Sequence, residues 1–417
     1  MGKTIIEKII ANHTAEDVTP GSIVWLEIDV RSARDFGGAN VVKNLEKYYP
    51  NEPQVADPKK TFFTFDCVVP AKTIGYAENQ HISRVFARNQ LARENLYDVD
   101  AGIGSHVMIE KGIAIPGSTV VGTDSHLNIL GAIGSFGQGM GDQDIAFAFK
   151  TGKTWFEVPE SMTITIEGKP ARNASAKDVT LGVLQQIGSK GALGKSIEFY
   201  GNTVESLDLA GRITLASMVT EMGGIIGLIH PDEKVIQYCK ERSGREFPVY
   251  ESDTDVEYIE KLKFDFSGLE PLIALPPSPA NVKPVAEVTG TPVDSVVVAS
   301  CTNGRYEDIS IVARILKNKK IHPNVMMKIV PATKEVYGQL LNDGLITILY
   351  EAGAIITNPG CGGCAAGQVG MTGKGEVQIS TGNRNFAGKQ GSGDTYLASP
   401  ATAAASALAG EISVPEL

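Results

Sequence analysis

Apolar and polar positions alternate with two different periods along this chain, and each period predicts a different kind of element. Runs rich in β-branched residues predict strands at Ser22–Asp29, Thr119–Thr123, Met162–Ile166 and Ser295–Ser300. Segments with helical periodicity begin near a capping Asp or Thr, at Asp142–Lys150, Asp178–Ile187 and Thr333–Asn342. Strands that alternate with helices in this way predict α/β layers, with functional side chains at the ends of the strands.

Two breaks divide the chain into predicted domains. One lies near residues 150 to 160, and the other lies in the Pro-rich run Leu275–Pro284, the best candidate for a linker. We therefore expect three α/β domains, at residues 1–155, 156–284 and 285–417, with the catalytic site between domains. Two further helices are expected, an amphipathic one in the first ten residues and one at Pro400–Ala409.

Composition narrows the class of protein. The chain has 417 residues, 42% hydrophobic and 21% charged, which is ordinary for a globular protein with two or three domains. A net charge of −10 without a compensating Lys/Arg block argues against a nucleic-acid or anionic-membrane partner, so a small-molecule ligand is expected. No apolar run approaches about 20 residues, and the N-terminus does not resemble a signal peptide. Five cysteines, an odd number in a long chain, fit a reducing cytoplasm, where we expect this protein.

Three cysteines carry the most specific chemical signal. Cys301 lies in Ala-Ser-Cys-Thr-Asn-Gly-Arg, and Cys361 and Cys364 lie in Asn-Pro-Gly-Cys-Gly-Gly-Cys. Thiolates select iron–sulfur clusters, and three of them leave one iron of a cubane cluster open to substrate, whereas four would suit electron transfer. The neighbouring glycines leave room for a bulky inorganic ligand. Zinc binding, redox chemistry and buried thiols without function remain alternatives for a single Cys-x-x-Cys.

Titratable groups gather in the first part of the chain. Gly122–His126 follows a predicted strand; there Asp124 either orients the imidazole of His126 for acid/base work or forms a turn with the neighbouring serine. The Gly-rich run that follows does not match a dinucleotide-binding unit, so NAD is excluded. Glu198 lies in an apolar, strand-like run, where an unpaired buried carboxylate would be costly. A functional partner and a water-facing strand edge are both open for Glu198.

A polar loop near the C-terminus suits a substrate carboxylate. Ser380–Lys389 places Asn383, Arg384 and Lys389 in one Gly-containing segment, although a solvated loop has the same composition. Cys239 is expected to be a small buried side chain on a helix. The histidines without metal spacing, expected to be structural, are His13, His81, His230 and His322.

Several motifs follow one another in a characteristic order. They are Val68–Thr73 with Ala77–Gln80, Gly122–His126, Glu221–Gly224, Ser300–Gly304, Pro359–Cys364 and Asn383–Phe386. Together they resemble the aconitase superfamily, most closely its branch of 3-isopropylmalate dehydratase large subunits and archaeal homoaconitases. The resemblance covers nearly the whole chain and implies three α/β/α-layered domains around a central cluster cleft.

The resemblance also implies a hydro-lyase with a [4Fe–4S] cluster on Cys301, Cys361 and Cys364. Its open iron acts as a Lewis acid on the hydroxyl and carboxylate of a hydroxy di- or tricarboxylic acid, while water is eliminated and re-added. The residues then expected to bind substrate are Ser125, Asn383, Arg384, Lys389 and Arg34. Those expected to assist proton transfer are Asp124, His126, Glu198, Asp66 and His106.

The chain is too short for a complete single-chain aconitase. Family members of this size lack the swivelling fourth domain, which a separate small subunit supplies. That subunit brings the serine taken as the carbon base and further arginine contacts. A hetero-oligomer is therefore expected, whose isolated large subunit is inactive.

Three departures from the family pattern fall at functional positions. Cys67 follows Asp66 where the family has histidine, and it could protonate the departing hydroxyl only as a thiol with a pKa near about 8.5, or through water. Ser105 occupies the position of a second family histidine, unless a shift of one residue in the alignment places His106 there. Lys389 stands where an arginine is usual, and an ammonium cannot reproduce a bidentate guanidinium.

A further difference adds cations to the expected substrate pocket. Arg31–Arg34 replaces a Thr-Ser-Pro-Gln-like stretch, so we expect a pocket tuned to another acid. The leading interpretation is a large subunit most like that of 3-isopropylmalate dehydratase, an enzyme of leucine biosynthesis. The alternatives are a paralogue for another substituted malate or a homocitrate-type acid, such as 2,3-dimethylmalate dehydratase or homoaconitase, and a non-catalytic cluster protein.

Overall fold

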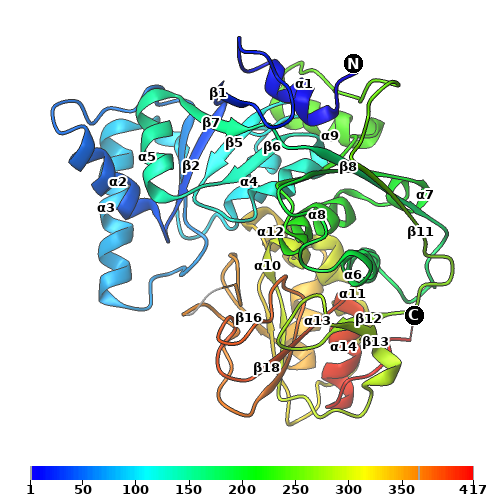
Figure 1. Ribbon diagram of the computed structural model, residues 1–417. Coiled ribbons are helices and arrows are strands. Elements are labelled where there is room, and N and C mark those ends of the chain that lie inside the picture. The colour runs from blue at the N-terminus through cyan, green and yellow to red at the C-terminus, as the bar shows by residue number, and fades with distance from the viewer. Residues whose placement is uncertain (1, 365–366, 417) are drawn as a thin grey trace. The chain divides into compact units, whose positions relative to one another are not determined.

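The computed structural model describes residues 2–364 and 367–416, which form two compact units (Figure 1). Each unit is assembled from separate stretches of the chain. Unit 1 is drawn from Met1–Thr165, Ala192–Gly201 and Gly223–Lys263, and unit 2 from Ile166–Gly191, Asn202–Met222 and Phe264–Leu417. Both units are α/β structures, as the alternation of strand and helix patterns predicted. The three domain boundaries given above stay a prediction.

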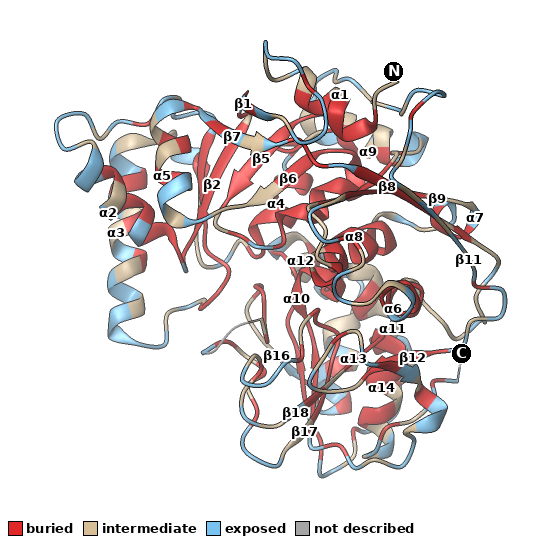
Figure 2. Ribbon diagram, viewed as in Figure 1, coloured by how far each residue is buried: buried red, intermediate tan, exposed pale blue. Residues whose placement is uncertain are grey.

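Unit 1 is built on a five-stranded parallel sheet with the order β4-β3-β2-β5-β6. Its central strands are buried along their length, as expected for a parallel sheet covered on both faces (Figure 2). The strand β2 is unusual because it is buried although it carries two arginines, Arg31 and Arg34. The elements of this layer are β2 (Val30–Arg34), α2 (Gly38–Tyr48), β3 (Thr61–Thr64), α3 (Ile74–Gln90), the 3-10 helix η1 (Arg93–Asn95), β4 (Leu96–Tyr97), α4 (Gly104–Glu110), β5 (Thr119–Gly122), the 3-10 helix η2 (Leu127–Ile133), β6 (Phe136–Gly139) and α5 (Asp142–Thr151).

Two smaller sheets also involve unit 1. β1 (Ile23–Glu27) pairs antiparallel with β7 (Lys153–Glu157). A four-stranded sheet has the order β10-β9-β8-β11, in which β9 lies parallel to both β8 and β10. Its strands and the two remaining helices of unit 1 are β8 (Ser161–Glu167), β9 (Ser196–Tyr200), β10 (Ile226–Ile229), β11 (Glu260–Asp265), α1 (Ile5–Ala11) and α9 (Glu233–Ser243).

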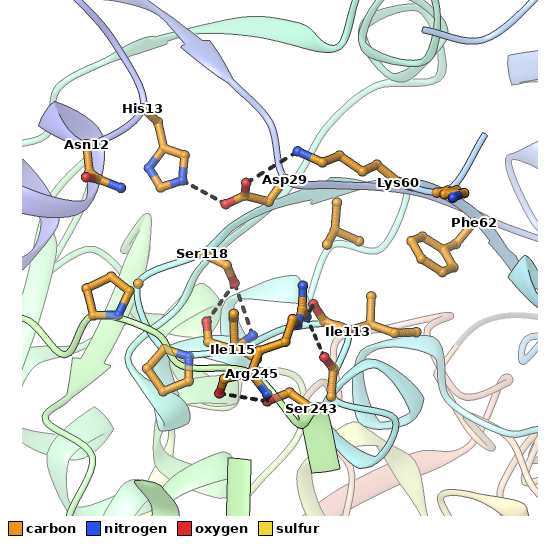
Figure 3. Close-up of a pocket in the computed structure, with 16 residues that line it drawn as sticks. Asn12, His13, Asp29, Lys60, Phe62, Ile113, Ile115, Ser118, Ser243 and Arg245 are labelled. Carbon is orange, nitrogen blue, oxygen red and sulfur yellow. Dashed lines mark hydrogen bonds and ion pairs between the residues drawn. The ribbon is translucent and has the colours of Figure 1, made fainter. Parts of the chain in front are cut away.

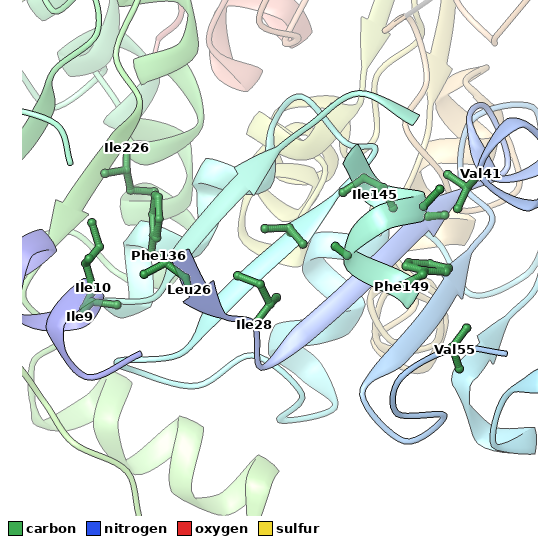
Figure 4. Close-up of a cluster of buried hydrophobic side chains, with 14 of the residues drawn as sticks. Ile9, Ile10, Leu26, Ile28, Val41, Val55, Phe136, Ile145, Phe149 and Ile226 are labelled. Carbon is green, nitrogen blue, oxygen red and sulfur yellow. The ribbon is translucent and has the colours of Figure 1, made fainter. Parts of the chain in front are cut away.

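One hydrophobic core connects these layers of unit 1 (Figure 4). Ile9 and Ile10 of α1, Leu26 of β1 and Phe149 of α5 all belong to it and are fully buried. Phe149 also packs edge-on against Phe63 of β3, with ring centroids 5.9 Å apart. Burial of each such side chain contributes about 1.5–3 kcal/mol, so this core fixes the sheet from which the polar residues of unit 1 project.

Unit 2 is built on a seven-stranded mixed sheet with the order β13-β12-β18-β17-β14-β15-β16. The strands from β18 to β16 are parallel, and β12 joins the sheet antiparallel to β18. The elements of unit 2 are α6 (Ala176–Ile187), α7 (Asn202–Glu205), α8 (Leu209–Ser217), the 3-10 helix η3 (Met218–Met222), β12 (Leu272–Ala274), β13 (Val282–Pro284), the 3-10 helix η4 (Val285–Glu287), β14 (Ser295–Val298), α10 (Ser300–Asn303), α11 (Tyr306–Leu316), β15 (Met326–Ile329), α12 (Lys334–Asn342), α13 (Leu345–Ala352), β16 (Ile355–Ile356), β17 (Val377–Ser380), β18 (Asp394–Ala398) and α14 (Pro400–Ala409).

The Pro-rich run Leu275–Pro284 lies inside unit 2. It leads from β12 to β13, which are antiparallel neighbours with Leu272 opposite Pro284. Proline is tolerated there because β13 is an edge strand of the sheet. The run is therefore a hairpin connection within one sheet and does not link the two units.

The carboxyl ends of the parallel strands carry the polar and cysteine-containing segments of unit 2. β14 leads into α10, β16 is followed by the loop that holds Cys361 and Cys364, and β17 is followed by Thr381–Lys389. Because these strands run in the same direction, the three segments emerge at one edge of the sheet. That edge is where ligand sites of open α/β sheets form.

Candidate active site

Cys301 lies directly after β14, at a strained turn. Ser300 has a φ of 82°, a left-handed conformation that residues other than glycine rarely adopt, and its hydroxyl accepts a hydrogen bond from the main-chain N–H of Thr302 at 3.1 Å. The side-chain amide of Asn383 donates to Cys301 Sγ over 3.5 Å, and Ser217 Oγ lies 3.9 Å from the same sulfur. Polar hydrogens beside a buried sulfur suit a thiolate that ligates a cluster.

The loop with Cys361 and Cys364 packs against the same strand end. Gly362 has a φ of 52°, and a Cβ on it would come within 2.8 Å of Val330 and 3.0 Å of Ala299. Only glycine fits both the conformation and the space. Cys361 is buried, Cys364 is partly exposed, and both are thiols. The two cysteine-bearing segments therefore adjoin, and the donor set that they offer is the soft, sulfur-only set that iron–sulfur clusters require.

The polar loop after β17 is held by side chains from distant parts of unit 2. Nε of Arg384 donates to Oε1 of Glu221 at 2.6 Å, and Gln390 donates to the main-chain oxygen of Arg384 at 2.8 Å. Glu221 is buried, whereas Arg384 keeps 18% of its side chain exposed. Lys389 is partly buried, with Nζ 5.9 Å from the centroid of the Phe386 ring. The ion pair fixes the direction of the Arg384 guanidinium. Glu221 lies in the motif Glu221–Gly224, whose local pattern does not predict this partner.

A fully buried lysine donates hydrogen bonds to the backbone of this loop. Lys177 Nζ donates to the main-chain oxygens of Thr381 (3.1 Å) and Gly382 (2.6 Å), the two residues before Asn383. Burial lowers the pKa of Lys177 to about 8, although the charge of Glu221 acts in the opposite direction. Lys177 belongs to none of the sequence motifs named above. Its signal was a cation in the first turn of α6, where the helix dipole disfavours positive charge.

In unit 1, one buried guanidinium bridges two carboxylates. Arg34, the last residue of β2, donates from Nε to Asp66 Oδ1 at 2.7 Å and from Nη1 to Asp124 Oδ1 at 2.9 Å. All three side chains are buried, at 9% exposed or less. Removing one member of such a buried ion pair destabilises the fold, because the remaining charge is buried without hydration or a counter-charge. Arg34, expected to contact substrate, is thus held by two of the acids expected to move protons.

Asp66 has the properties of a proton donor or acceptor near neutral pH. Burial raises its pKa to about 6; the guanidinium of Arg34 lowers it, and the charges of Asp35 and Asp124 raise it. Its Oδ2 accepts a hydrogen bond from the main-chain N–H of Gly104 at 2.9 Å. A buried carboxyl group whose pKa lies close to the working pH is a candidate acid/base group.

Cys67 is tied to Asp66 and to a second acid. Its thiol donates to Asp66 Oδ1 over 3.3 Å, and its main-chain N–H donates to Asp35 Oδ1 at 2.9 Å. The other oxygen of Asp35 accepts from the main-chain N–H of Val68 at 3.1 Å and from Gln80 at 3.2 Å. Asp35 therefore fixes the backbone of the segment that presents Asp66 and Cys67. It went unnoticed in the sequence, where its signal was an acidic residue directly after the buried strand β2.

The remaining predicted residues of this region cluster around β5 and α4. Asp124 Oδ1 accepts a hydrogen bond from the main-chain N–H of His126 at 3.0 Å, and Ser125 Oγ lies 3.1 Å from His126 Nδ1. These contacts describe a turn closed by the carboxylate. Ser105 and His106 are both buried in the first turn of α4. Within the described residues, Ser105 Oγ has no hydrogen-bond partner.

Glu198 is fully buried and its carboxylate is surrounded by donors. Oε1 accepts from the main-chain N–H of Ile5 and from Ser252, each at 2.8 Å. Oε2 accepts from the hydroxyls of Tyr200 at 2.5 Å and Tyr258 at 2.7 Å. The carboxylate thereby anchors the first turn of α1, whose N–H groups favour an anion. This geometry supports a structural role, and the predicted part in proton transfer stays a prediction.

The sequence matches a known family along nearly its whole length. Residues 7–292 and 282–410 fit the model of the "Aconitase family (aconitate hydratase)". The chain belongs to the aconitase family. It is similar to the 3-isopropylmalate dehydratase large subunit of Sulfurihydrogenibium sp., 43% identical over 419 residues that cover 100% of this chain and 97% of the relative. The 3-isopropylmalate dehydratase large subunit 1 of Methanopyrus kandleri is 44% identical, covering 100% and 99%.

Two further comparisons bear on function and fold. The "Probable methanogen homoaconitase large subunit" of Methanothermobacter thermautotrophicus is 43% identical, over 98% of this chain and 97% of the relative. The crystal structure of aconitase X from Thermococcus kodakaraensis superposes with a TM-score of 0.52 at 12% identity, covering 85% of this chain and 83% of that one. This likeness supports the predicted aconitase-type α/β fold. Among the described residues no helix has the length and apolar character needed to cross a membrane.

Proposed function

We propose that this chain is the cluster-bearing large subunit of an iron–sulfur hydro-lyase that dehydrates and rehydrates 3-isopropylmalate. The observation that carries the proposal is the edge of unit 2, where two adjoining segments present Cys301, Cys361 and Cys364 and the amide of Asn383 donates to the Cys301 sulfur. Full-length similarity to dehydratase large subunits supplies the reaction class.

The proposed cofactor is a [4Fe–4S] cluster held by the three thiolates. Glycine at position 362 and a sulfur-only donor set fit such a group, whereas zinc sites with three cysteines usually add a histidine or a fourth cysteine. When bound, the cluster supplies a Lewis-acidic iron for the substrate hydroxyl. Ser217 and Asn383 then tune the sulfur of Cys301 through hydrogen bonds.

The residues of the chain itself bind the acid and handle protons. Arg384, directed by Glu221, holds a substrate carboxylate, and Lys177 fixes the backbone from which Asn383 and Arg384 project. Dehydration removes a proton from one carbon and hydroxide from its neighbour, so the departing hydroxide needs an acid. Asp66, with a pKa of about 6, is the group in unit 1 that we assign to that task, in its protonated form.

We also propose that a second subunit completes the enzyme. Several relatives are named as large subunits, and a small subunit that carries the swivelling domain and the carbon base would complete the enzyme. Such an enzyme works in the cytoplasm, where its thiols stay reduced. A relative 43% identical is named a probable methanogen homoaconitase large subunit, so a homocitrate-type acid or another substituted malate is the runner-up.

The experiment is an anaerobic reconstitution with iron, sulfide and the small subunit, followed by assays of water elimination. The substrates are 3-isopropylmalate, homocitrate and 2,3-dimethylmalate. We expect formation of the unsaturated acid from 3-isopropylmalate, and none from the large subunit alone. A cluster without turnover of any of these acids would support a non-catalytic cluster protein, and bound zinc without visible absorption would reject the iron–sulfur assignment.

A further inference from the structure

A cavity of about 460 Å³ lies in unit 1 (Figure 3). Asp29 precedes β2, Lys60 precedes β3 and Ser118 precedes β5, so the walls come from the amino ends of these parallel strands. The carboxyl ends of the same strands lead to Arg34 and the acids around it. The volume falls in the range of small-molecule sites, about 300–1,000 Å³. The cavity is therefore separate from the residues assigned to catalysis.

A histidine neutralises the acid of this cavity. His13 contacts acceptors with both ring nitrogens, the main-chain oxygen of Ile9 from Nδ1 and Asp29 Oδ2 from Nε2, each at 2.7 Å. A carbonyl and a carboxylate can only accept, so the ring must donate from both nitrogens and carries a positive charge. Burial opposes this charge, but the hydrogen bonds to Asp29 and Ile9 raise the pKa of His13. With Asp29 paired in this way, its carboxylate does little to repel an anion from the cavity.

Further cations line the cavity, two of them without a carboxylate partner among the described residues and one with a long ion pair. Arg245 Nη2 donates to the main-chain oxygens of Gly112 (2.7 Å) and Ile113 (3.4 Å), which anchors the guanidinium at the wall. In the described part of the chain, no carboxylate lies within 4.0 Å of Arg245 or Lys59. Lys60 reaches Asp29 only at 3.9 Å and keeps 51% of its side chain exposed. In a chain with a net charge of −10, such a gathering of cations favours an anionic ligand.

Much of the remaining lining is apolar, although Asn12, Ser118 and Ser243 also contribute to it. Phe62, Ile113, Ile115, Pro116 and Pro248 contribute side chains to the wall (Figure 3). The hydroxyl of Ser118 is taken up within its own turn, where it donates to Ile115 O at 2.6 Å. A bare inorganic ion would leave these apolar surfaces in contact with water, whereas a ligand with a short apolar body would cover them.

We infer that this cavity binds a small organic anion, with an anionic carboxylate or phosphate group at Lys60 and Arg245 and a short apolar body against Phe62 and Ile113. Guanidinium and ammonium groups recognise both kinds of head group. A ligand held here lies at the amino ends of the strands whose carboxyl ends bear Asp66 and Asp124.

Isothermal titration of the full-length chain tests the inference, with three probes: 4-methylpentanoate, isobutyl phosphate and inorganic phosphate. We expect saturable binding of one of the two organic anions, and whichever binds more tightly identifies the head group. Arg245→Met and Lys60→Met should each weaken that binding at least tenfold. Inorganic phosphate should bind at least tenfold more weakly than the better organic probe.

Two control variants separate this cavity from other cationic surfaces. Arg384→Met removes a cation from the proposed substrate loop, and Lys153→Met removes a surface lysine paired with Glu27. Both should leave the titration unchanged. The inference would be overturned by the absence of saturable heat with either organic anion, or by inorganic phosphate binding as tightly as isobutyl phosphate. It would also be overturned if only Arg384→Met lost binding, or if Lys153→Met weakened binding as much as the cavity variants do.

Discussion

Arg384 in unit 2 and Arg34 in unit 1 are both held by carboxylates, but they differ in what remains for a ligand. Arg384 pairs with Glu221 through Nε at 2.6 Å and stays 18% exposed. Arg34 pairs with Asp66 and Asp124 at 2.7 and 2.9 Å and is 9% exposed. The first guanidinium is oriented by its partner, whereas the second is shared between two acids. Arg34, which departs from the family pattern, therefore acts more by balancing the charges of Asp66 and Asp124 than by contacting substrate.

The largest expected effect lies in unit 2, at the thiols. Cys301→Ser, Cys361→Ser and Cys364→Ser should each strip most of the iron from reconstituted protein, because three thiolates are the whole protein donor set proposed for the cluster. Iron and sulfide analysis measures this directly. Cys239→Ser is the matched control: Cys239 is equally a thiol and buried, but lies on α9 in unit 1. Equal iron contents in all four variants would reject the cluster site.

The next effect compares two arginines of the same strand. Arg34→Met should lower the free energy of unfolding by about 3–5 kcal/mol, since it leaves Asp66 and Asp124 buried without their counter-charge. Arg31→Met should change it by only about 1 kcal/mol or less, because Nε and Nη2 of Arg31 are buried without hydrogen-bond partners among the described residues. Chemical denaturation of the cluster-free chain measures both. Similar losses in the two variants would show that charge pairing is not what stabilises this strand.

Lys177 provides a test of how the substrate loop is positioned. Lys177→Met removes charge-assisted hydrogen bonds to Thr381 and Gly382, each worth about 1.5–3 kcal/mol, so kcat/KM of the assembled enzyme should fall about 10–100-fold. Lys195→Met, which removes a lysine paired with Glu260 in unit 1, should leave kcat/KM unchanged. An unchanged kcat/KM in Lys177→Met would mean that the loop keeps its position without the lysine.

The same lysine predicts a pH dependence of stability. Its pKa is about 8 in the folded chain and 10.5 in the unfolded chain, so between these values the unfolded state binds more protons. Stability contributed by this group must therefore rise with pH from about 8 to about 10.5, by at most about 1.4 kcal/mol per pH unit, and stay level outside that window. The difference in unfolding free energy between the natural chain and Lys177→Met gives the measurement. A difference that falls with pH would contradict the assigned environment.

The smallest expected effect concerns Cys67. Its backbone is held by Asp35 and its thiol contacts Asp66, so Cys67→His would place an imidazole beside Asp66 in a fixed segment. Activity of the assembled enzyme on 3-isopropylmalate should rise a few-fold, while Cys67→Ala should not raise it. If Cys67→His leaves activity unchanged, the tuning of the pocket lies with Lys389 and Arg34 instead.

Local patterns in the sequence predicted many single elements well. The helices expected at Asp142–Lys150 and Pro400–Ala409 are found at Asp142–Thr151 and Pro400–Ala409, because capping groups and apolar periodicity act over a few residues. The Pro-rich run Leu275–Pro284, the best linker candidate in the sequence, joins β12 to β13, and the domain boundary expected there stays a prediction. Its role as a hairpin depends on the pairing of β12 with β13, which no local composition reveals.

Site residues that lie in short motifs could be predicted from the sequence. Contacts between residues far apart in the chain could not. The cysteines and Asn383 could be named from the sequence, whereas the pairing of Arg384 with Glu221 joins residues 163 positions apart. Lys177 reaches Gly382 across 205 positions. Such contacts are set by sheet order, which one sequence does not contain. The residues missed were therefore the supports of the site and not its ligands.

The central claim is that this chain holds a cluster with an iron open to substrate. Electron paramagnetic resonance of the reduced protein, prepared anaerobically with its small subunit and titrated with 3-isopropylmalate, tests it most directly. We expect a cluster spectrum that shifts as the acid is added until the shift saturates. In Arg384→Met the same shift should need higher concentrations of the acid. A cluster spectrum that none of the hydroxy acids changes in the assembled protein, or the absence of any cluster signal, would contradict it.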